Sequence, residues 1–260
     1  MMFNYLKHGT LLAPIVKKVE EKIKEVHEAI ERRSEANQFR VLQSFQKHRV
    51  SDSHFIPTTG YGYDDIGRDT LEEIYADVFG GEAGLVRPQI ISGTHAISIA
   101  LFGVLRPGDE LVYITGKPYD TLEEIVGIRG SGVGSLKEFK IDYQTVDLRE
   151  NGKIDFDAVK NAITPKTKMI GIQRSKGYAT RPSFTLTEIE EMITFVKSLK
   201  EDVVIFVDNC YGEFVEELEP CHIGADLIAG SLIKNPGGGI AKTGGYIVGK
   251  KSLVEACSYR

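Results

Sequence analysis

The stretch "TKMIGIQRSKGYATRPSFTLTEIEEMITFVKSLKEDVVIFVD", residues 167–208, decides the fold class. Its two ends, 167–173 and 203–208, are apolar runs of strand length that are rich in β-branched residues. Between them, the apolar residues of 183–199 recur at the three- and four-residue spacing of an amphipathic helix. The stretch therefore predicts a strand, a helix and a second strand.

The same alternation of short apolar runs and helical periods continues along most of the chain. Further strands are expected at 89–92, 110–114, 143–148, 226–230 and 245–249, and further helices begin near Thr94, Tyr119 and Phe156. Alternating strands and helices favour a mostly parallel sheet with helices on both faces. We therefore predict an α/β domain with a seven-stranded sheet.

The N-terminal segment has a different pattern. From 14 to about 50 the chain is charged, with apolar residues at helical spacing from Ile15 to Ile30, and Pro14 suits the first turn of a helix. We expect an amphipathic packing helix with a solvated charged face. A glycine- and tyrosine-rich loop (58–69) and a helix at 70–80 follow. The chain thus divides into a helical arm, 1–57, and a main domain, 58–260.

Composition excludes several classes of partner. The formal charge is -5, with 42% hydrophobic and 27% charged residues and no long basic run, so neither nucleic acid nor an anionic membrane has electrostatic support. The three cysteines lack metal-like spacing and fit a reducing compartment. No segment has membrane-spanning length and the first residues lack a signal-peptide pattern, so a cytoplasmic protein without a metal site is expected.

Polar residues directly after apolar runs are the first candidates for a site, because ligands of open α/β sheets bind beyond the carboxyl ends of the strands. In "SGTHA", Gly93, Thr94 and His95 stand where a helix begins, and free amides there favour an anion such as phosphate, although a simple helix cap fits equally well. Asp208 ends an apolar strand, where a carboxylate needs a cation, a metal or a salt bridge.

Three further positions could carry chemistry. Lys234, in "GSLIKNPGGG" (230–239), could form a Schiff base with a carbonyl compound, or could be a loop lysine paired with a carboxylate. Tyr119 could present its ring to a flat heterocycle or belong to the core. The loop residues Tyr61, Tyr63 and Arg68 could grip a phosphate or form an exposed turn.

Together these residues match one ligand. An anion site at Thr94, an aromatic plane at Tyr119, an acid at Asp208 and an amine at Lys234 correspond to the phosphate, ring, ring nitrogen and aldehyde of pyridoxal 5'-phosphate. The joint occurrence is far less expected by accident than any single feature. A nicotinamide cofactor is disfavoured because no GxGxxG follows an early strand, and "GSGVG" (130–134) is expected to be a loop.

On the motifs "GYGYDDIGRDTLE", "SGTHAI", "GKPYDTLEEIVGIRGSGVGSLKEF", "QRSKGYATRPS", "VDNCYGEF" and "GSLIKNPGGGIAKTGGYIVG", the chain resembles a family of fold-type I pyridoxal-phosphate enzymes. This is the family of aluminium resistance or methionine gamma-lyase proteins, within the Cys/Met metabolism group. The motifs cover most of the chain after residue 58.

The resemblance implies a role for each candidate residue. Lys234 would bond to the cofactor aldehyde, Asp208 would pair with the ring nitrogen, and Tyr119 would stack on the ring. Gly93, Thr94 and Ser231 would lie near the phosphate, and Ser175 near the phenolic oxygen. Either Tyr61 or Tyr63, together with Arg68, would come from a neighbouring subunit, which implies a homodimer or homotetramer with shared active sites.

The resemblance also implies the activity and a missing part. The expected function is cleavage of a carbon–sulfur bond in a sulfur-containing amino acid, as in methionine gamma-lyase or cystathionine lyases. Another reaction of the same cofactor, such as aldol cleavage, and a catalytically inactive stress-response binding protein remain open. In the family, a smaller C-terminal domain carries an arginine for the substrate carboxylate, and it is expected beyond residue 260.

Overall fold

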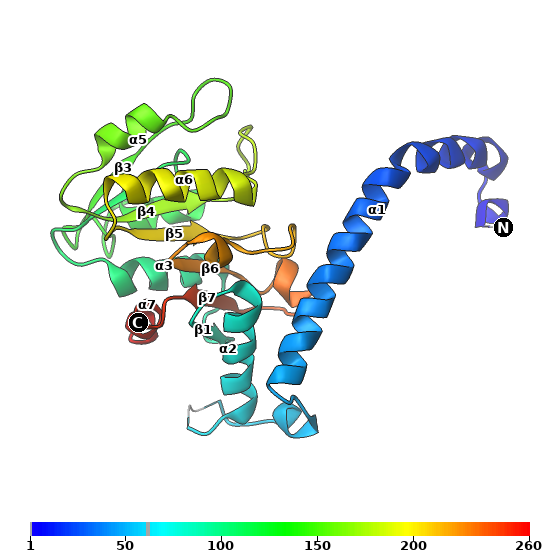
Figure 1. The fold of residues 1–260 in the computed structure, drawn as a ribbon, viewed down its shortest axis with the longest axis horizontal. Helices are drawn as coiled ribbons and strands as arrows, with labels where there is room; N and C mark the ends of the chain where they lie inside the picture. Colours follow the sequence, from blue (N-terminus) through cyan, green and yellow to red (C-terminus); the bar gives the residue numbers. More distant parts are fainter. Residues whose placement is uncertain (1, 61–62) are drawn as a thin grey trace.

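The predicted sheet is present in the computed structural model, which describes residues 2–60 and 63–260 (Figure 1). Within these residues, seven strands form one sheet in the order β1-β7-β6-β5-β4-β2-β3. Neighbouring strands from β6 to β3 are parallel, whereas β7 is antiparallel to both β6 and β1. The strands are β1 (Ala83–Arg87), β2 (Glu110–Tyr113), β3 (Asp142–Thr145), β4 (Thr167–Gln173), β5 (Val204–Asp208), β6 (Leu227–Ser231) and β7 (Gly245–Gly249).

Helices cover both faces of this sheet, which confirms the predicted α/β class. The helices are α1 (Gly9–Lys47), α2 (Ile66–Phe79), α3 (Gly93–Val104), α4 (Glu123–Val126), α5 (Phe156–Ala162), α6 (Leu186–Leu199) and α7 (Lys251–Ser258). Short 3-10 segments are η1 (Met2–Tyr5), η2 (Asp52–Phe55), η3 (Asp120–Leu122), η4 (Pro220–Ile223) and η5 (Asn235–Gly237).

The stretch 167–208 folds as its pattern predicts, into β4, α6 and β5. α6 begins with a capping box, in which Thr185 accepts from the Glu188 amide and the Glu188 carboxylate accepts from the Thr185 amide. β4 and β5 then pair in parallel with Gln173 opposite Asp208. The carboxyl ends of the two strands therefore reach the same edge of the sheet.

The strand predicted at 89–92 is wrong. The first strand is β1, at Ala83–Arg87, where Leu85 and Val86 are buried and the backbone pairs with β7. Pro88 follows immediately and has no N–H for a strand ladder. Residues 88–92 instead form a turn leading to α3, and Ile91 is 64% exposed.

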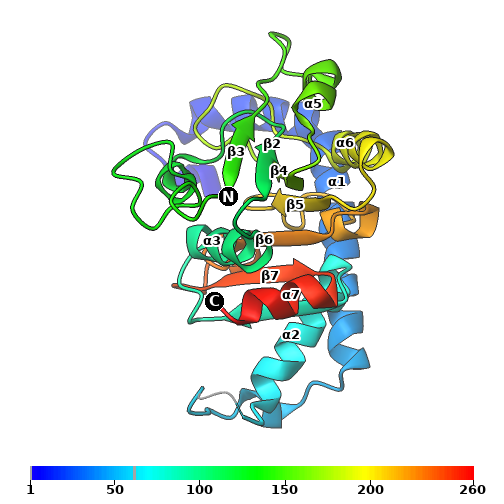
Figure 2. The same cartoon turned by 90° about the vertical axis from the view of Figure 1, so that its left-hand side faces the viewer.

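Each face of the sheet has its own apolar core. On one face, side chains of α2, α5 and α6 pack on the sheet, and on the other face side chains of α3, α4 and α7 do so. α3 and α7 lie side by side on this second face (Figure 2). Buried residues that represent the two cores are Ile74, Phe79, Val159 and Ile189 on the first face and Ala96, Leu101, Val126 and Cys257 on the second.

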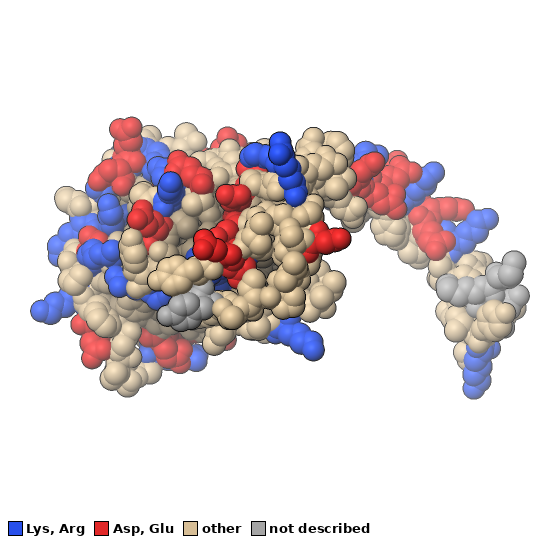
Figure 3. All heavy atoms as spheres, turned by 90° about the horizontal axis from the view of Figure 1, so that it is seen from below, with Lys and Arg blue, Asp and Glu red and all other residues tan. Residues whose placement is uncertain are grey.

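The N-terminal helix differs from its prediction in two respects. α1 begins at Gly9, so Pro14 lies inside the helix rather than in its first turn, where its missing N–H leaves the Thr10 carbonyl without its usual helical donor. The packing expected for this helix is present only in its C-terminal half. Its N-terminal half projects from the body with acidic and basic side chains interspersed (Figures 1 and 3), and Ile15 and Val19 are about half exposed, at 53% and 48%.

Candidate active site

The carboxyl ends of β4, β5 and β6 meet the beginning of α3 at one edge of the sheet. Asp208 and Ser231 are the last residues of β5 and β6, and the first residue of α3 is Gly93. A cavity of about 140 Å³ lies at this edge. Its walls include seven of the residues that the sequence analysis selects, namely Gly93, Thr94, Tyr119, Ser175, Asp208, Ser231 and Lys234.

Asp208 is the buried acid of this cavity. Its side chain is 4% exposed, and its Oδ1 accepts a hydrogen bond of 3.1 Å from the Cys210 amide. Burial raises the pKa of Asp208 above its usual value, and the positive charges of Lys234 and Arg181 oppose this rise. An added cation would therefore be stabilised here, because it would favour the ionised carboxylate.

Lys234 places its amine between two aromatic rings. Its Nζ lies 4.2 Å from the ring centroid of Tyr211 and 6.0 Å from that of Tyr119. Among the residues that the structure describes, this amine has no carboxylate within ion-pair distance, so the alternative of a loop lysine in an ion pair is not observed. The next residue, Asn235, donates to the carbonyls of Tyr211 (3.3 Å) and Glu213 (2.9 Å) and so ties the lysine loop to the chain after Asp208.

The beginning of α3 forms the opposite wall. Ser92, not Thr94, caps the helix by accepting from the His95 amide at 3.1 Å, and the Thr94 hydroxyl bonds to Thr121 at 2.8 Å. The Ser231 side chain faces this helix end, and its Oγ is buried without a partner among the described residues. Gly93 permits this close approach, because a Cβ at that position would lie 3.0 Å from the Ser231 Cβ.

Three of the predicted site residues that the structure describes do not line this cavity, namely His95, Arg68 and Tyr63. The His95 ring accepts a hydrogen bond from the Ile91 amide at 3.3 Å. Arg68 pairs with Asp69 at 2.8 Å and lines another cavity of about 350 Å³ at the start of α2. The Tyr63 side chain is 84% exposed, and Tyr61 lies outside the residues that the structure describes.

The site also contains residues that sequence reasoning did not select. Tyr211 lines the cavity and holds its backbone at φ 67°, in the left-handed region that a tyrosine seldom adopts. Cys210 and Thr121 line the same cavity, and Arg181 donates to the carbonyls of Gln173 (3.0 Å) and Ser175. In the stretch "VDNCYGEF" (207–214), sequence reasoning selects only the acidic residues as candidates. No local sequence pattern predicts that its tyrosine adopts a left-handed backbone.

Behind the cavity lies a second buried acid, Glu213, which is 1% exposed. Its Oε1 accepts from the Tyr246 hydroxyl at 2.8 Å, and its Oε2 has no partner among the described residues. Burial raises the pKa of Glu213 to about 8. Within the described ranges no group of three or more His, Cys, Asp or Glu side chains is placed to hold a metal ion.

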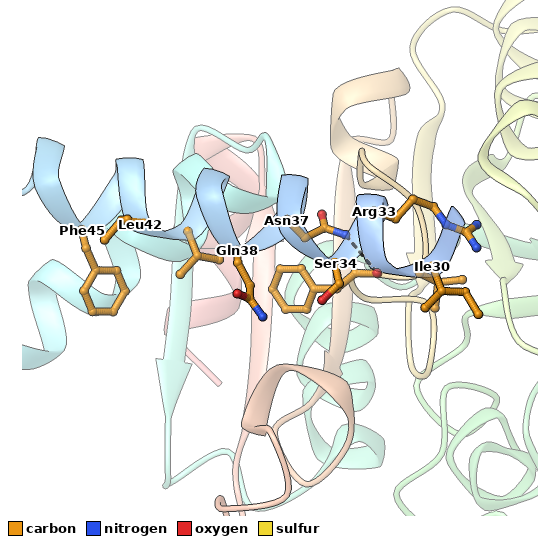
Figure 4. Close-up of a pocket in the computed structure, with 10 residues that line it drawn as sticks. Ile30, Arg33, Ser34, Asn37, Gln38, Leu42 and Phe45 are labelled. Carbon is orange, nitrogen blue, oxygen red and sulfur yellow. Dashed lines mark hydrogen bonds between the residues drawn. The ribbon is translucent and has the colours of Figure 1, made fainter. Parts of the chain in front are cut away.

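A larger cavity of about 860 Å³ lies along α1, away from these groups (Figure 4). Its walls contain Val41, Leu42, Phe45 and Phe214, and none of the predicted site residues. Its charged wall residue is Arg33, and among the described residues of its wall it has no carboxylate, histidine, cysteine or lysine that could act as an acid, base or nucleophile. The smaller cavity at Lys234 is therefore the better candidate for an active site.

The described part of the chain contains no helix that is both long enough and apolar enough to cross a membrane.

The sheet and its edge site place the protein in the fold-type I class of α/β proteins. A solved structure from Campylobacter jejuni that carries N'-pyridoxyl-lysine-5'-monophosphate matches 74% of this chain and 42% of its own, with 26% identity and a TM-score of 0.55. The pyridoxal-phosphate-dependent protein YhfS of Escherichia coli shares the fold at 20% identity with a TM-score of 0.64.

The chain belongs to the methionine gamma-lyase family, whose model matches residues 12–260. It is 74% identical to the uncharacterized protein YnbB of Bacillus subtilis, over the whole of this chain and 62% of that protein. A Bacillus cereus structure is 76% identical, with a TM-score of 0.94, over 95% of this chain and 61% of that one. The chain thus spans about three fifths of the length of these relatives.

Two further relatives have functional names. A carbon-sulfur lyase involved in aluminum resistance, from Clostridium novyi, is 44% identical with a TM-score of 0.91, over 96% of this chain and 60% of its own. The L-methionine gamma-lyase of Pseudomonas putida is 29% identical over 203 residues, which is 75% of this chain and 44% of that protein. The resemblance stated from the motifs is therefore confirmed.

Proposed function

We propose that this chain binds pyridoxal 5'-phosphate in the Lys234 cavity and serves a lyase that cleaves a carbon–sulfur bond of a sulfur-containing amino acid. One observation carries the proposal: a buried carboxylate, Asp208, and a lysine amine without an ion-pair partner among the described residues line the same cavity. The names of the Clostridium novyi and Pseudomonas putida relatives support the reaction class.

The groups that line the cavity fit this cofactor. Ser231 Oγ is a buried hydroxyl without a partner among the described residues, beside the first amides of α3, and both would suit a phosphate. Asp208 would suit the ring nitrogen, and Lys234 the aldehyde. The half-buried ring of Tyr119 would suit the flat face of the ring.

When bound, the cofactor supplies an electron sink that acidifies the Cα proton of an attached amino acid. The task of Asp208 is to stay ionised beside a positive ring nitrogen. Burial alone raises the pKa of Asp208 and so opposes ionisation, but a carboxylate and a cation attract more strongly away from water, so the positive ring nitrogen would hold Asp208 in its ionised form. Neutralising Asp208 would therefore weaken both cofactor binding and turnover.

Lys234 would then move protons at the substrate. Its amine lines the same cavity as Asp208, so with cofactor and substrate bound it would serve as the base that takes up and returns a proton there. The Tyr211 ring, 4.2 Å from Nζ, would hold the protonated amine at this place. The left-handed backbone of Tyr211 and the two hydrogen bonds donated by Asn235 fix the Tyr211 ring next to the Lys234 amine.

Arg68 and one of the tyrosines, Tyr61 or Tyr63, would complete a phosphate site in a second copy of the chain. This assembly, a homodimer or homotetramer, is part of the proposal. The position of Arg68 supports it, because Arg68 lines a cavity that shares no wall residue with the Lys234 cavity of its own chain.

The direct test is chemical trapping of the lysine. Pyridoxal 5'-phosphate is added to the chain, the absorbance band of the bound cofactor is recorded, the sample is reduced with borohydride, and peptides are mapped by mass spectrometry. We expect the added mass on the peptide that contains Lys234. Lys234→Ala should abolish the adduct completely, whereas Lys242→Ala, at an exposed position, should not change it. An adduct that persists on another lysine in Lys234→Ala would refute the assignment.

The reaction class needs a separate assay. Cystathionine, methionine, cysteine and threonine are supplied to the loaded protein, and keto acid, thiol and aldehyde products are measured. Thiol and keto acid release would support carbon–sulfur cleavage, whereas aldehyde from threonine would point to aldol cleavage. Asp208→Asn should lose most turnover while the Lys234 adduct still forms, and unchanged turnover would exclude the proposed role of Asp208.

A further inference from the structure

The Lys234 cavity adjoins a neighbouring cavity of about 320 Å³, here called the distal cavity. Ser175 and Tyr211 line both of them, so the two spaces meet at these side chains. The distal cavity is also lined by Arg33, Arg174, Ser183 and Glu216. It therefore has room for a molecule that reaches beyond the reacting amine.

Most charges in the distal cavity are already compensated. Arg174 pairs with Glu216 at 2.7 Å, and Glu216 also accepts from the Leu186 amide at 3.0 Å. Arg33 is different: its side chain is half-buried, and within the described ranges no carboxylate or other acceptor binds its guanidinium. Arg33 also lines the large cavity along α1, so it stands between the two spaces, and it brings an uncompensated positive charge to the distal cavity.

The helix that carries Arg33 is held firmly against the body. Arg33, Asn37 and Arg40 lie at i, i+4 and i+7, and so on one face of α1. Asn37 donates to the carbonyls of Phe214 (3.0 Å) and Glu216 (3.1 Å), and Arg40 donates to the Glu217 carbonyl. Figure 4 shows the Arg33 guanidinium at the end of this row, directed away from the side chains of Leu42 and Phe45.

The polar groups of the distal cavity favour a carboxylate. A guanidinium binds a carboxylate through two parallel hydrogen bonds. The Ser183 hydroxyl already accepts from the Lys176 amide at 3.1 Å, so its hydrogen remains for an acceptor. A thioether side chain without a charge would leave Arg33 without a partner in this space.

We infer that Arg33 binds a second carboxylate at the far end of the substrate, so that the preferred substrate is a sulfur amino acid with two carboxylates, one on each side of the sulfur. This inference rests on the proposed function, because it assumes that the reacting amine is held at Lys234. Arg33 then acts on substrate selection and takes no part in bond cleavage.

Binding, not turnover, tests this role. The chain is loaded with pyridoxal 5'-phosphate, and L-cystathionine or S-methyl-L-cysteine is titrated while the cofactor absorbance is followed. Arg33→Gln should weaken cystathionine binding by about 10- to 100-fold, the usual loss of a charged hydrogen-bonded pair. Binding of S-methylcysteine should stay within about 2-fold, since it has no second carboxylate. The matched control is Arg32→Gln, at the exposed neighbouring position.

Each outcome has a definite meaning. Arg33→Lys keeps the positive charge but lacks the planar, two-donor geometry of the guanidinium. It should therefore retain part of the preference for cystathionine that Arg33→Gln loses. Equal binding of cystathionine by Arg33→Gln and the parent chain, or equal weakening of both ligands, would overturn the inference while the Lys234 adduct stands. A parent chain that takes up no cofactor at Lys234 would overturn the proposed function and the inference together.

Discussion

Two buried polar clusters lie on either side of the segment from Asp208 to Glu219, and they differ in how fully their groups are paired. In the first, here called the arginine network, Arg174 donates to Asn209 (2.9 Å), and Asn209 donates to Glu219 (3.0 Å). Glu219 also accepts from the Phe214 amide at 2.8 Å and has Arg40 at 3.8 Å. Each charged side chain of this network has at least one partner, although Arg40 Nε is buried without one among the described residues.

The second cluster, here called the cavity groups, is incompletely paired. Ser231 Oγ and Glu213 Oε2 have no hydrogen-bond partner in the described part of the chain, and Lys234 Nζ faces an aromatic ring instead of a carboxylate. An unpaired buried polar group is unfavourable for folding. The comparison teaches that the charges of the arginine network are compensated within the fold, whereas Ser231 and Lys234, which line the cavity, are not, as the proposed binding of a ligand requires.

The largest expected effect on stability is in the arginine network. Glu219→Ala removes the carboxylate that accepts from Asn209 and the Phe214 amide, and one of the two ion-pair partners of Arg174. The free energy of unfolding should therefore fall by about 3–5 kcal/mol. Urea denaturation measures it. Glu217→Ala, at an exposed side chain two residues away, should change stability by less than about 0.5 kcal/mol. A similar loss of unfolding free energy in Glu219→Ala and Glu217→Ala would show that the arginine network contributes no more to stability than an exposed side chain.

A smaller effect concerns pH and the cavity groups. The pKa of Glu213 is raised to about 8, so the folded chain holds a proton that the unfolded chain releases near pH 4.5. The resulting stability is fully present below about pH 4.5 and is lost as the pH rises through about 8, on the order of a few kcal/mol in total.

Glu213→Gln tests this pH dependence, because the amide cannot ionise and its oxygen can still accept from Tyr246. Urea denaturation at several values between pH 5 and pH 9 should show a steep fall in stability for the parent and a flatter profile for the variant. A profile that is equally steep in both would assign the titration to another group.

The smallest expected stability change is at Ser231. Ser231→Ala removes a buried hydroxyl that has no partner among the described residues, so stability should stay the same or rise by up to about 1 kcal/mol. Affinity for pyridoxal 5'-phosphate should fall by about 5- to 10-fold through the loss of one hydrogen bond. A clear loss of stability would mean that the hydroxyl serves the fold, and the contrast between the two clusters would disappear.

The fold was predictable where a local pattern and burial agree. β4 and β7 have the predicted bounds, 167–173 and 245–249, because their apolar runs are buried on both faces of the sheet. The prediction at 89–92 failed because the apolar pair Ile90 and Ile91 follows Pro88. The real strand has a weaker pattern, since its buried residues are Gly84, Leu85 and Val86 and only the last two have large apolar side chains.

The residues of the candidate site were predictable from sequence where polar side chains directly follow a predicted strand. Asp208 and Lys234 were selected because they follow apolar runs, and parallel pairing brings such strand ends together. Ser231 was selected only through the family resemblance. Tyr211 and Arg33 could not be found in this way. Tyr211 depends on a left-handed backbone that its residue type disfavours, and Arg33 depends on where a helix from the distant N-terminus docks.

The amino-acid sequence by itself determined the alternation of strands and helices, the edge at which the chemistry gathers, and the residues that carry the family resemblance. These follow from hydrophobic period and from the local chemistry of strand ends and helix starts. The tertiary structure alone decided which polar groups are paired and which are left for a ligand. It did so because the ion pair of Arg40 with Glu219 and the hydrogen bond of Asn37 with Phe214 join residues more than 170 positions apart, which meet only when α1 packs against the body.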